Sequence, residues 1–381
     1  MEWKEVTATE YCSKIADGTH DSPKRQSFGK YLITSKHIKG HSIDFDNAYF
    51  ISEDDYQKII KRSKVDKWDV IISMIGEYCG FCYVEDSDFT DYAVKNVGIF
   101  KVGERIKSLW LYYYLTSPDG KAQLKSIRAG SSQPYISLGA LRDLIIPVPS
   151  IEKMKEIVSV LSSLDRKIEL NNKINADLEE MAQAIFKNWL SKCCNEVAIG
   201  ELSLNVTDYE KIDAEEVVLI NSSDVTEGYF DHHNYSPNKN LKGHFKKRFQ
   251  KGDILYSQVR PRNRHWAYCN FDANDYLAST QLMVIRNNPS LITSILLYQY
   301  IISDNVWKEF TLKTETRSGT FPQGNYEDLS QIRVPYNSDV EGISNQLETL
   351  YAKMFMLEKE SSRLSLLRDT LLPRLMSGEI E

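Results

Sequence analysis

Two long segments of this chain repeat apolar residues at alternating steps of three and four positions. The first runs from about residue 152 to 192, and the second from about 338 to 377. This spacing puts the apolar side chains on one stripe of an α-helix, as in the seam of a coiled coil. The stripes are Met154, Ile157, Leu161, Leu164, Ile168, Leu178, Ile185 and Trp189, and then Ile343, Leu347, Leu350, Met354, Leu357, Leu364, Leu371 and Leu375. The pattern predicts two long helices that pack along these stripes.

The two helices belong to a larger internal repeat. Ile157 and Ile343 are 186 positions apart, and the shift stays between 184 and 188 in the segments that precede the helices. The matching segments are Lys67–Ser73 with Lys251–Ser257, Trp110–Ser117 with Leu296–Ser303, and Leu144–Pro147 with Ile332–Pro335. Chance similarity of apolar runs would not keep the same order and spacing. The chain is therefore predicted to be a tandem duplication of whole domains, and not a solenoid of short units.

Each long helix follows a segment that mixes strand-like and helical patterns. Strands are predicted at residues 71–75, 97–102, 254–257 and 282–286, and a helix is predicted near 108–117. The predicted fold class is therefore α/β or α+β domains in tandem, joined by long helices with a pseudo-two-fold internal repeat. The predicted segments are a first domain at 1–150, a central helix at 151–194, a second domain at 195–336 and a C-terminal helix at 337–381.

Polar residues interrupt both apolar stripes. Asn171 and Asn175 interrupt the first stripe, and Ser361 and Arg368 interrupt the second. Polar groups at a helix seam lower stability but can fix its register. The alternative is that these side chains rotate out of the contact, and the sequence does not decide between the two.

The charge pattern separates the domains from the helices. The net charge of −6 argues against a nonspecific nucleic-acid coat. Basic residues nevertheless cluster in each domain, and acidic residues are frequent on the helices, which fits DNA at the domains and protein on the helices. A solvated surface is the alternative for each run. The basic clusters are Lys58, Lys61, Arg62, Lys64 and Lys67, and then Lys242, Lys246, Lys247, Arg248, Lys251, Arg260, Arg262 and Arg264.

The composition indicates a cytoplasmic protein. The 381 residues are 42% hydrophobic and 26% charged, as in ordinary globular proteins. The apolar stretches are too short to span a bilayer, and the first residues lack the apolar core of a signal peptide. The six scattered cysteines do not suggest a disulfide framework, so we expect a reducing compartment.

The chain lacks the motifs of the common catalytic sites. It has no Walker phosphate loop, no G-x-G-x-x-G after a strand, no H-E-x-x-H and no Asn-Pro-Pro-aromatic segment of amino-methyltransferases. Cys79 and Cys82 form a lone pair without a second pair at zinc-like distance. The sequence therefore predicts no catalytic and no metal-binding residues, which favours binding over catalysis.

Two loops carry the side chains best suited to contact DNA bases. Base recognition in a groove commonly uses Arg on guanine and Asn or Gln on adenine. The second domain offers Arg260, Arg262, Asn263 and Arg264, with Lys246 and Lys247 expected at phosphates, and an ion-paired surface loop is the alternative. In the first domain the candidates are Ser132, Gln133 and Tyr135, whose counterparts in the second are Thr320 and Gln323, and a tight turn closing each domain is the alternative. Further candidates are Arg128, Arg317, Lys36 and His37.

Several segments resemble one known family over essentially the whole chain. They are Asp17–His20, Gly130–Ile136, Ile145–Pro149 leading into the first long helix, Ala182–Trp189 at its end, and Leu371–Glu379. Together they resemble the specificity subunit of type I restriction–modification enzymes. None of these segments is a catalytic signature, so the resemblance rests on their order.

The resemblance implies two target-recognition domains, each of which recognises one half of a bipartite double-stranded DNA sequence. The two helices would pack antiparallel as a coiled coil that sets the spacing. Two methyltransferase (modification) subunits would dock on the helices, and motor-nuclease (restriction) subunits would complete the complex. S-adenosylmethionine, ATP and Mg²⁺ would bind those partners, with no cofactor in this chain. The chain would thus be a non-catalytic subunit of an adenine-N6 DNA methyltransferase and site-specific deoxyribonuclease. The alternative is a coiled-coil adaptor that does not bind DNA.

Overall fold

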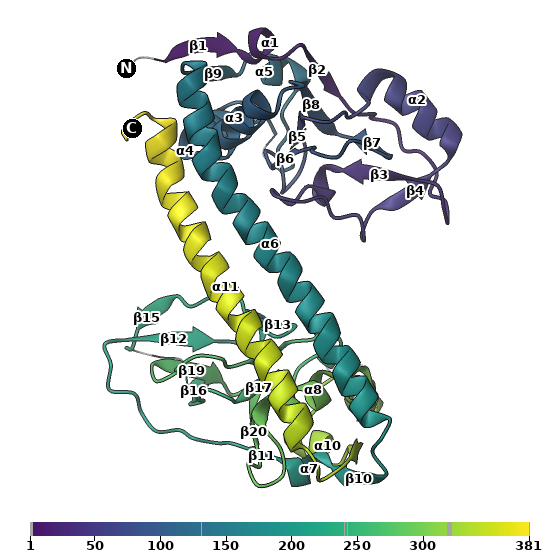
Figure 1. Ribbon diagram of the computed structural model, residues 1–381, viewed down its shortest axis with the longest axis vertical. Helices are drawn as coiled ribbons and strands as arrows, with labels where there is room; N and C mark the ends of the chain where they lie inside the picture. The colour runs from purple at the N-terminus through teal and green to yellow at the C-terminus, as the bar shows by residue number, and fades with distance from the viewer. Residues whose placement is uncertain (1–2, 131, 240, 242, 318–321, 381) are drawn as a thin grey trace. The chain divides into compact units, whose positions relative to one another are not determined.

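The computed structural model describes residues 3–130, 132–239, 241, 243–317 and 322–380. The chain forms two compact units. Unit 1 comprises Met1–Leu170 and Ser361–Glu381, and unit 2 comprises Asn171–Glu360. The long helices α6 (Ile151–Leu190) and α11 (Glu341–Met376) each contribute one part to unit 1 and the other part to unit 2 (Figure 1). The division of the chain at residues 150, 194 and 336 stays a prediction.

Unit 1 is built on small sheets. Its strands are β1 (Lys4–Thr7), β2 (Lys14–Asp17), β3 (Lys30–Thr34), β4 (Tyr49–Ile51), β5 (Asp69–Ser73), β6 (Cys82–Val84), β7 (Tyr92–Lys95), β8 (Val97–Lys101) and β9 (Ile145–Val148). An antiparallel sheet has the order β2-β8-β5-β6, and a second sheet has the order β4-β3-β7, in which β3 and β7 are parallel. β1 pairs with β9 directly before α6 begins, so the last strand of the domain leads into the long helix.

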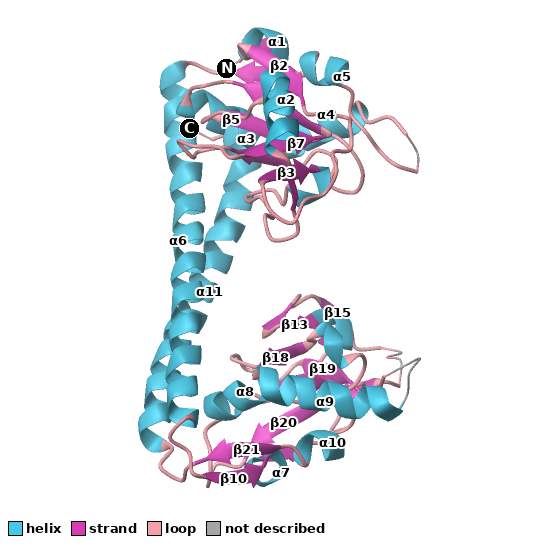
Figure 2. Ribbon diagram, turned by 90° about the vertical axis from the view of Figure 1, so that its right-hand side faces the viewer, coloured by secondary structure: helices cyan, strands magenta, loops and turns pink. Residues whose placement is uncertain are grey.

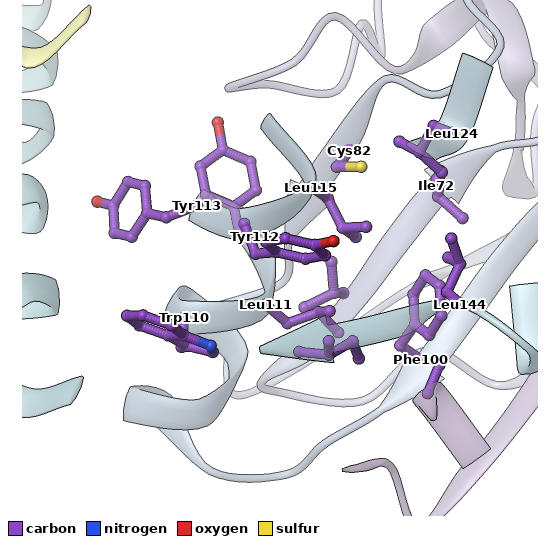
Figure 3. Packing of buried hydrophobic residues seen from close by; sticks show 14 of the residues in the cluster. Ile72, Cys82, Phe100, Trp110, Leu111, Tyr112, Tyr113, Leu115, Leu124 and Leu144 are labelled. Carbon is purple, nitrogen blue, oxygen red and sulfur yellow. The ribbon is translucent and has the colours of Figure 1, made fainter. Parts of the chain in front are cut away.

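The core of unit 1 forms around a helix whose residues 109–115 are all apolar or aromatic. The helical segments are α1 (Ala8–Tyr11), η1 (Ser35–His37), α2 (Glu53–Ser63), α3 (Arg105–Thr116), α4 (Pro118–Ser126) and α5 (Leu138–Arg142). Figure 3 shows Trp110, Leu111 and Tyr112 of α3 packed among the apolar side chains of this core. The indole Nε1 of Trp110 donates to the carbonyl oxygen of Pro147 at 2.9 Å, which ties α3 to β9.

Unit 2 repeats this order of elements. Its strands are β10 (Asn195–Ala198), β11 (Ser203–Asn205), β12 (Glu216–Ile220), β13 (Val225–Thr226), β14 (Tyr229–Phe230), β15 (Tyr235–Pro237), β16 (Phe245–Lys247), β17 (Ile254–Ser257), β18 (Trp266–Tyr268), β19 (Tyr276–Ser279), β20 (Leu282–Asn287) and β21 (Arg333–Tyr336). The sheet β11-β20-β17-β18 corresponds to β2-β8-β5-β6 of unit 1, and the parallel pair of β12 and β19 corresponds to β3 and β7. Unit 2 has β16 where unit 1 has α2, and it also contains the antiparallel pair of β13 and β14.

The helices of unit 2 cover one face of its sheet. They are α7 (Ile199–Leu202), η2 (Ser222–Asp224), η3 (Pro261–Asn263), α8 (Ser294–Ile302), α9 (Asp304–Arg317) and α10 (Tyr326–Ser330). Figure 2 shows α8 and α9 lying across the strands. The strands predicted at 254–257 and 282–286 are confirmed as β17 and β20, and the predicted long helices are confirmed as α6 and α11. No helix within the described part of the chain is long and apolar enough to cross a membrane.

Polar residues of the two apolar stripes lie inside contacts between α6 and α11. In unit 2 the buried Asn171 donates from Nδ2 to Oε2 of Glu360 at 2.8 Å. In unit 1 the guanidinium of Arg368 pairs with the Asp165 carboxylate at 2.9 Å. These side chains therefore do not rotate out to solvent, and the structure favours the role in helix register over the alternative.

Candidate nucleic-acid interface

The structure brings the two predicted loops of the second domain together. The loop Gln258–His265, here called the arginine loop, connects β17 to β18. The backbone N–H of Arg260 donates to the carbonyl oxygen of Pro322 at 3.0 Å, and the N–H of Gly324 donates to that of Gln258 at 2.8 Å. Val259 and Gln323 form an antiparallel bridge between these two bonds. Gln323 therefore lies beside the arginine loop, and the two predicted segments belong to one surface.

Unit 1 contains the same junction. The N–H of Gly76 donates to the carbonyl oxygen of Pro134 at 2.8 Å, and the N–H of Ile136 donates to that of Met74 at 2.9 Å. Ile75 and Tyr135 form the corresponding antiparallel bridge. Within the described residues, the structure thus relates Pro134 and Tyr135 to Pro322 and Gln323, because corresponding loops contact both pairs.

The arginine loop is bounded by two residues in the left-handed region of backbone conformation. The φ angles are 48° at Arg260 and 53° at Arg264. The corresponding residues of unit 1 are Gly76 and Gly80, with φ of 80° and 96°. Left-handed backbone is unfavourable for residues with a Cβ, and such strain is found preferentially at functional sites. Arginine at both ends of a loop whose backbone would suit glycine therefore indicates a role for the two side chains.

Side chains of helix α9 hold the arginine loop in place through hydrogen bonds and a cation–π contact. The indole Nε1 of Trp307 donates to the carbonyl oxygen of Pro261 at 2.9 Å. The guanidinium of Arg264 lies 4.3 Å from the centroid of the same indole ring and donates to Asp304 at 3.3 Å. Arg264 is thus half-buried and anchored on α9, whereas Arg260, Arg262 and Asn263 are exposed. In the middle of the loop Arg262 and Asn263 are exposed, and the Arg262 guanidinium pairs with Glu315 of α9.

The two lysines predicted at phosphates have different environments. Lys246 is exposed, with Nζ 4.9 Å from the centroid of the Tyr209 ring. Lys247 is buried, and its Nζ donates to the carbonyl oxygens of Leu282 at 2.7 Å and Thr280 at 3.2 Å. Burial lowers the pKa of the Lys247 ammonium, and the neighbouring Lys246 lowers it further. The prediction of a phosphate contact by Lys247 is therefore corrected, because the side chain joins strands inside the unit.

Two of the unit 1 candidates also have structural roles. His37 is 1% exposed, and its Nδ1 accepts a hydrogen bond from the backbone N–H of Thr34 at 3.0 Å. The guanidinium of Arg128 donates to the carbonyl oxygen of Cys79, in the loop between β5 and β6. We therefore correct the prediction that His37 contacts DNA, since it does not reach the surface. Arg128 is exposed and supports the loop through its hydrogen bond to Cys79.

The other candidates remain available at the surface. Lys36, Ser132, Gln133 and Tyr135 are exposed in unit 1. In unit 2 Gln323 is exposed as well. Arg317 is described only as the last residue of α9, and Thr320 lies outside the described residues. Their contacts with DNA stay predictions.

Sequence reasoning missed the unit 1 counterpart of the arginine loop, which is Met74–Phe81. The loop contains no arginine or lysine, so the charge pattern of the sequence does not point to it. The signal was present in the repeat, because the shift of 184 that aligns Lys67 with Lys251 also aligns Gly76 with Arg260. Within the described residues, no group of three or more His, Cys, Asp or Glu side chains is arranged to hold a metal ion.

Known proteins similar to this chain belong to one class. A family model described as the type I restriction modification DNA specificity domain matches residues 2–180. The specificity subunit of the type I restriction enzyme HindI from Haemophilus influenzae is 36% identical over 138 residues, which are 36% of this chain and 30% of that protein. The MjaVIII specificity subunit from Methanocaldococcus jannaschii is 28% identical over 152 residues, which are 38% of this chain and 35% of that protein. The matches thus span about a third of the length of these curated relatives.

The fold is also similar to a solved structure over nearly its whole length. The S subunit of the type I restriction-modification system from M. genitalium superposes with a TM-score of 0.64 at 15% sequence identity. The match covers 98% of this chain and 96% of that one. At this identity the likeness concerns the fold, which is mixed α/β with two units in tandem.

Proposed function

We propose that the chain belongs to the family of type I restriction–modification DNA specificity domains, whose model matches residues 2–180, and that the whole chain is a sequence-specific DNA-recognition subunit. Unit 1 recognises one half of a bipartite duplex sequence and unit 2 recognises the other half. The chain supplies the choice of sequence, while catalysis belongs to its partners.

The repeated loop junction is the observation that carries this proposal. In unit 1 the loop that follows β5 contacts a segment that contains a proline. In unit 2 the loop that follows β17 contacts a corresponding segment through the same backbone hydrogen bonds. The backbone is retained between the units, whereas the side chains differ. Arg262 and Asn263 occupy the middle of the unit 2 loop, and Tyr78 and Cys79 occupy the same positions in unit 1. One scaffold with two sets of side chains is what recognition of two different half-sites requires.

We propose that α6 and α11 form an antiparallel coiled coil that sets the spacing between the half-sites. The 40 residues of α6 correspond to about 60 Å of helix at 1.5 Å per residue. In unit 1 Tyr113 donates to Asp165 on α6 at 2.7 Å, and in unit 2 Gln299 donates to Tyr351 on α11 at 2.6 Å. Tyr113 and Gln299 are 186 positions apart in the sequence, and so are Asp165 and Tyr351. This correspondence supports a pseudo-two-fold relationship in which each unit is fixed to the helices in the same way.

We propose that the helices also dock two methyltransferase subunits, to which motor-nuclease subunits are added. Exposed apolar side chains on both helices support this proposal, because such groups are typical of protein interfaces. They are Ile151, Val160, Leu170 and Met181 on α6, and Met356, Leu366 and Leu367 on α11. S-adenosylmethionine, ATP and Mg²⁺ belong to these partner subunits in the proposal.

Selection from a library of random duplexes tests the proposed function. The full chain should enrich a bipartite sequence, and its affinity should fall steeply with salt because phosphate contacts release counterions. An adaptor without DNA binding would enrich no sequence and would show no salt-dependent affinity. That result would reject the proposed function in favour of the adaptor.

A further inference from the structure

The loop Met74–Phe81 of unit 1 has the same internal backbone geometry as the arginine loop Gln258–His265. Both loops connect corresponding neighbouring strands, β5 with β6 and β17 with β18. The matching hydrogen bonds are Ser73 N–H to Phe81 O at 2.8 Å and Cys79 N–H to Gly76 O at 3.1 Å in unit 1, and Ser257 N–H to His265 O at 2.9 Å and Asn263 N–H to Arg260 O at 2.9 Å in unit 2. The residues between the two left-handed positions are therefore presented on the same local backbone in both units.

The side chains on this backbone differ in hydrogen-bonding character between the two units. Glu77 and Tyr78 occupy the positions of Pro261 and Arg262. Glu77 is exposed, and Tyr78 is half-buried. The arginine loop offers donors to a ligand, whereas the unit 1 loop offers a carboxylate acceptor and a phenol.

The unit 1 loop is held in place and carries positive charge nearby. The Arg128 guanidinium donates to the carbonyl oxygen of Cys79, and a Cβ on Gly80 would lie 2.8 Å from that guanidinium. The φ of 96° at residue 80 favours glycine there, beside the Arg128 guanidinium. The Lys39 ammonium lies 4.0 Å from the centroid of the Tyr78 ring. The positive charge of Lys39 offsets the repulsion between the Glu77 carboxylate and DNA phosphates, so the loop can approach DNA.

We propose that Glu77 and Tyr78 form the base-recognition site of unit 1, and that this site selects a base with an exocyclic amino group in the major groove. A carboxylate accepts a hydrogen bond from the amino group of cytosine, whereas the carbonyl oxygen of guanine or thymine would repel it. Arg128 is a positioning residue that fixes the loop through Cys79. The proposal rests on the function proposed above and assigns the chemistry of one half-site.

Selection from random duplexes with the full-length Glu77→Gln, Glu77→Arg and Tyr78→Ala variants tests this site. Glu77→Gln should relax the preference at one base pair of one half-site by roughly tenfold, and Glu77→Arg should shift that preference toward guanine. Tyr78→Ala should weaken selection in the same half-site. The control Glu53→Gln removes one exposed carboxylate from α2 of the same unit and should leave the selected sequence unchanged.

The outcomes separate this inference from the proposed function. If the wild-type chain enriches a bipartite sequence and the Glu77 and Tyr78 variants enrich the identical sequence, the site is wrong while the proposed function stands. If the wild-type chain enriches no sequence, the proposed function itself fails. Circular dichroism and thermal unfolding of each variant establish that the fold is retained. Glu77→Arg adds a gain of preference that a misfolded chain would not show.

Discussion

Arg262 in the arginine loop forms an ion pair with Glu315 on α9, in which a guanidinium nitrogen lies 2.7 Å from Oε2 of the carboxylate. The Arg262 side chain is nevertheless 72% exposed, and that of Glu315 is 27% exposed. The carboxylate therefore orients the guanidinium without burying it. An arginine held in this way keeps donors that can face guanine or a phosphate.

Replacement of Arg262 by Ala should weaken specific DNA binding on the order of tenfold and relax one base pair of the unit 2 half-site. Glu315→Gln should act in the opposite direction, because it removes a carboxylate that competes with DNA for the guanidinium. Titration of the selected duplex and of single-base variants measures both effects. Equal affinities for wild type and Arg262→Ala would show that the arginine loop does not contact DNA.

Substitutions of Lys246 and Lys247 should have different effects, one on DNA binding and the other on the stability of the fold. Lys247→Met removes the donor to two buried carbonyl oxygens and should lower the free energy of unfolding by about 1–3 kcal/mol. The slope of log affinity against log salt should not change. Lys246→Ala should leave stability unchanged and reduce that slope by about one if Lys246 contacts a phosphate. Denaturant unfolding and salt titrations distinguish the two, and the reverse assignment would contradict the structure.

Burial of His37 should make stability depend on pH. Burial lowers the pKa of the His37 imidazole below its ordinary value of 6.5, and the positive charge of Lys36 lowers it further. The unfolded chain then binds more protons, so this stabilisation is fully present above about pH 6.5 and is lost as pH falls through the folded pKa. Each unit of pKa lowering corresponds to about 1.4 kcal/mol.

The measurement is the free energy of unfolding of wild type and His37→Asn between pH 7.5 and pH 5. Asn can still accept a hydrogen bond from the backbone N–H of Thr34 but does not titrate in this range. The wild type should lose more stability than the variant as pH falls. Parallel pH profiles would show that His37 does not contribute.

The contact between Arg368 and Asp165 should stabilise unit 1 as a pair. Their side chains are 16% and 21% exposed, so the pair lies between the surface and buried cases. Arg368→Met should cost about 2 kcal/mol, because Asp165 would keep a poorly solvated charge. The double variant with Asp165→Asn should recover part of that loss. A double-mutant cycle measures the coupling, and a coupling of zero would remove the pair from the account of helix register.

The fold was largely predictable because its pattern is long and occurs twice. The apolar stripes from Met154 to Trp189 and from Ile343 to Leu375 extend over many turns, and each copy of the repeat supports the other. Short elements were less predictable. Pro373 lies near the end of the second long helix, and α11 continues past it to Met376. A helix already packed on both units can retain a proline near its end.

The candidate site was predictable only in part, because sequence shows charge but not burial. Lys247 and Lys246 are equivalent in sequence terms, and only the strand register places one inside and the other outside. His37 and Arg128 were candidates because their side chains can hydrogen-bond to DNA. In the structure His37 instead accepts a hydrogen bond from the backbone of Thr34, and Arg128 donates one to the backbone of Cys79. The pairing of residues 259 and 323 depends on a contact between distant segments.

The central claim is that two related units recognise half-sites at one fixed separation. DNA advances about 3.4 Å and rotates by about a tenth of a turn for each base pair. Binding of the full chain to duplexes with the spacer lengthened or shortened by one base pair tests the claim most directly. We expect affinity to fall at least about tenfold for either change. Equal affinity for all three spacers would contradict a rigid helical spacer.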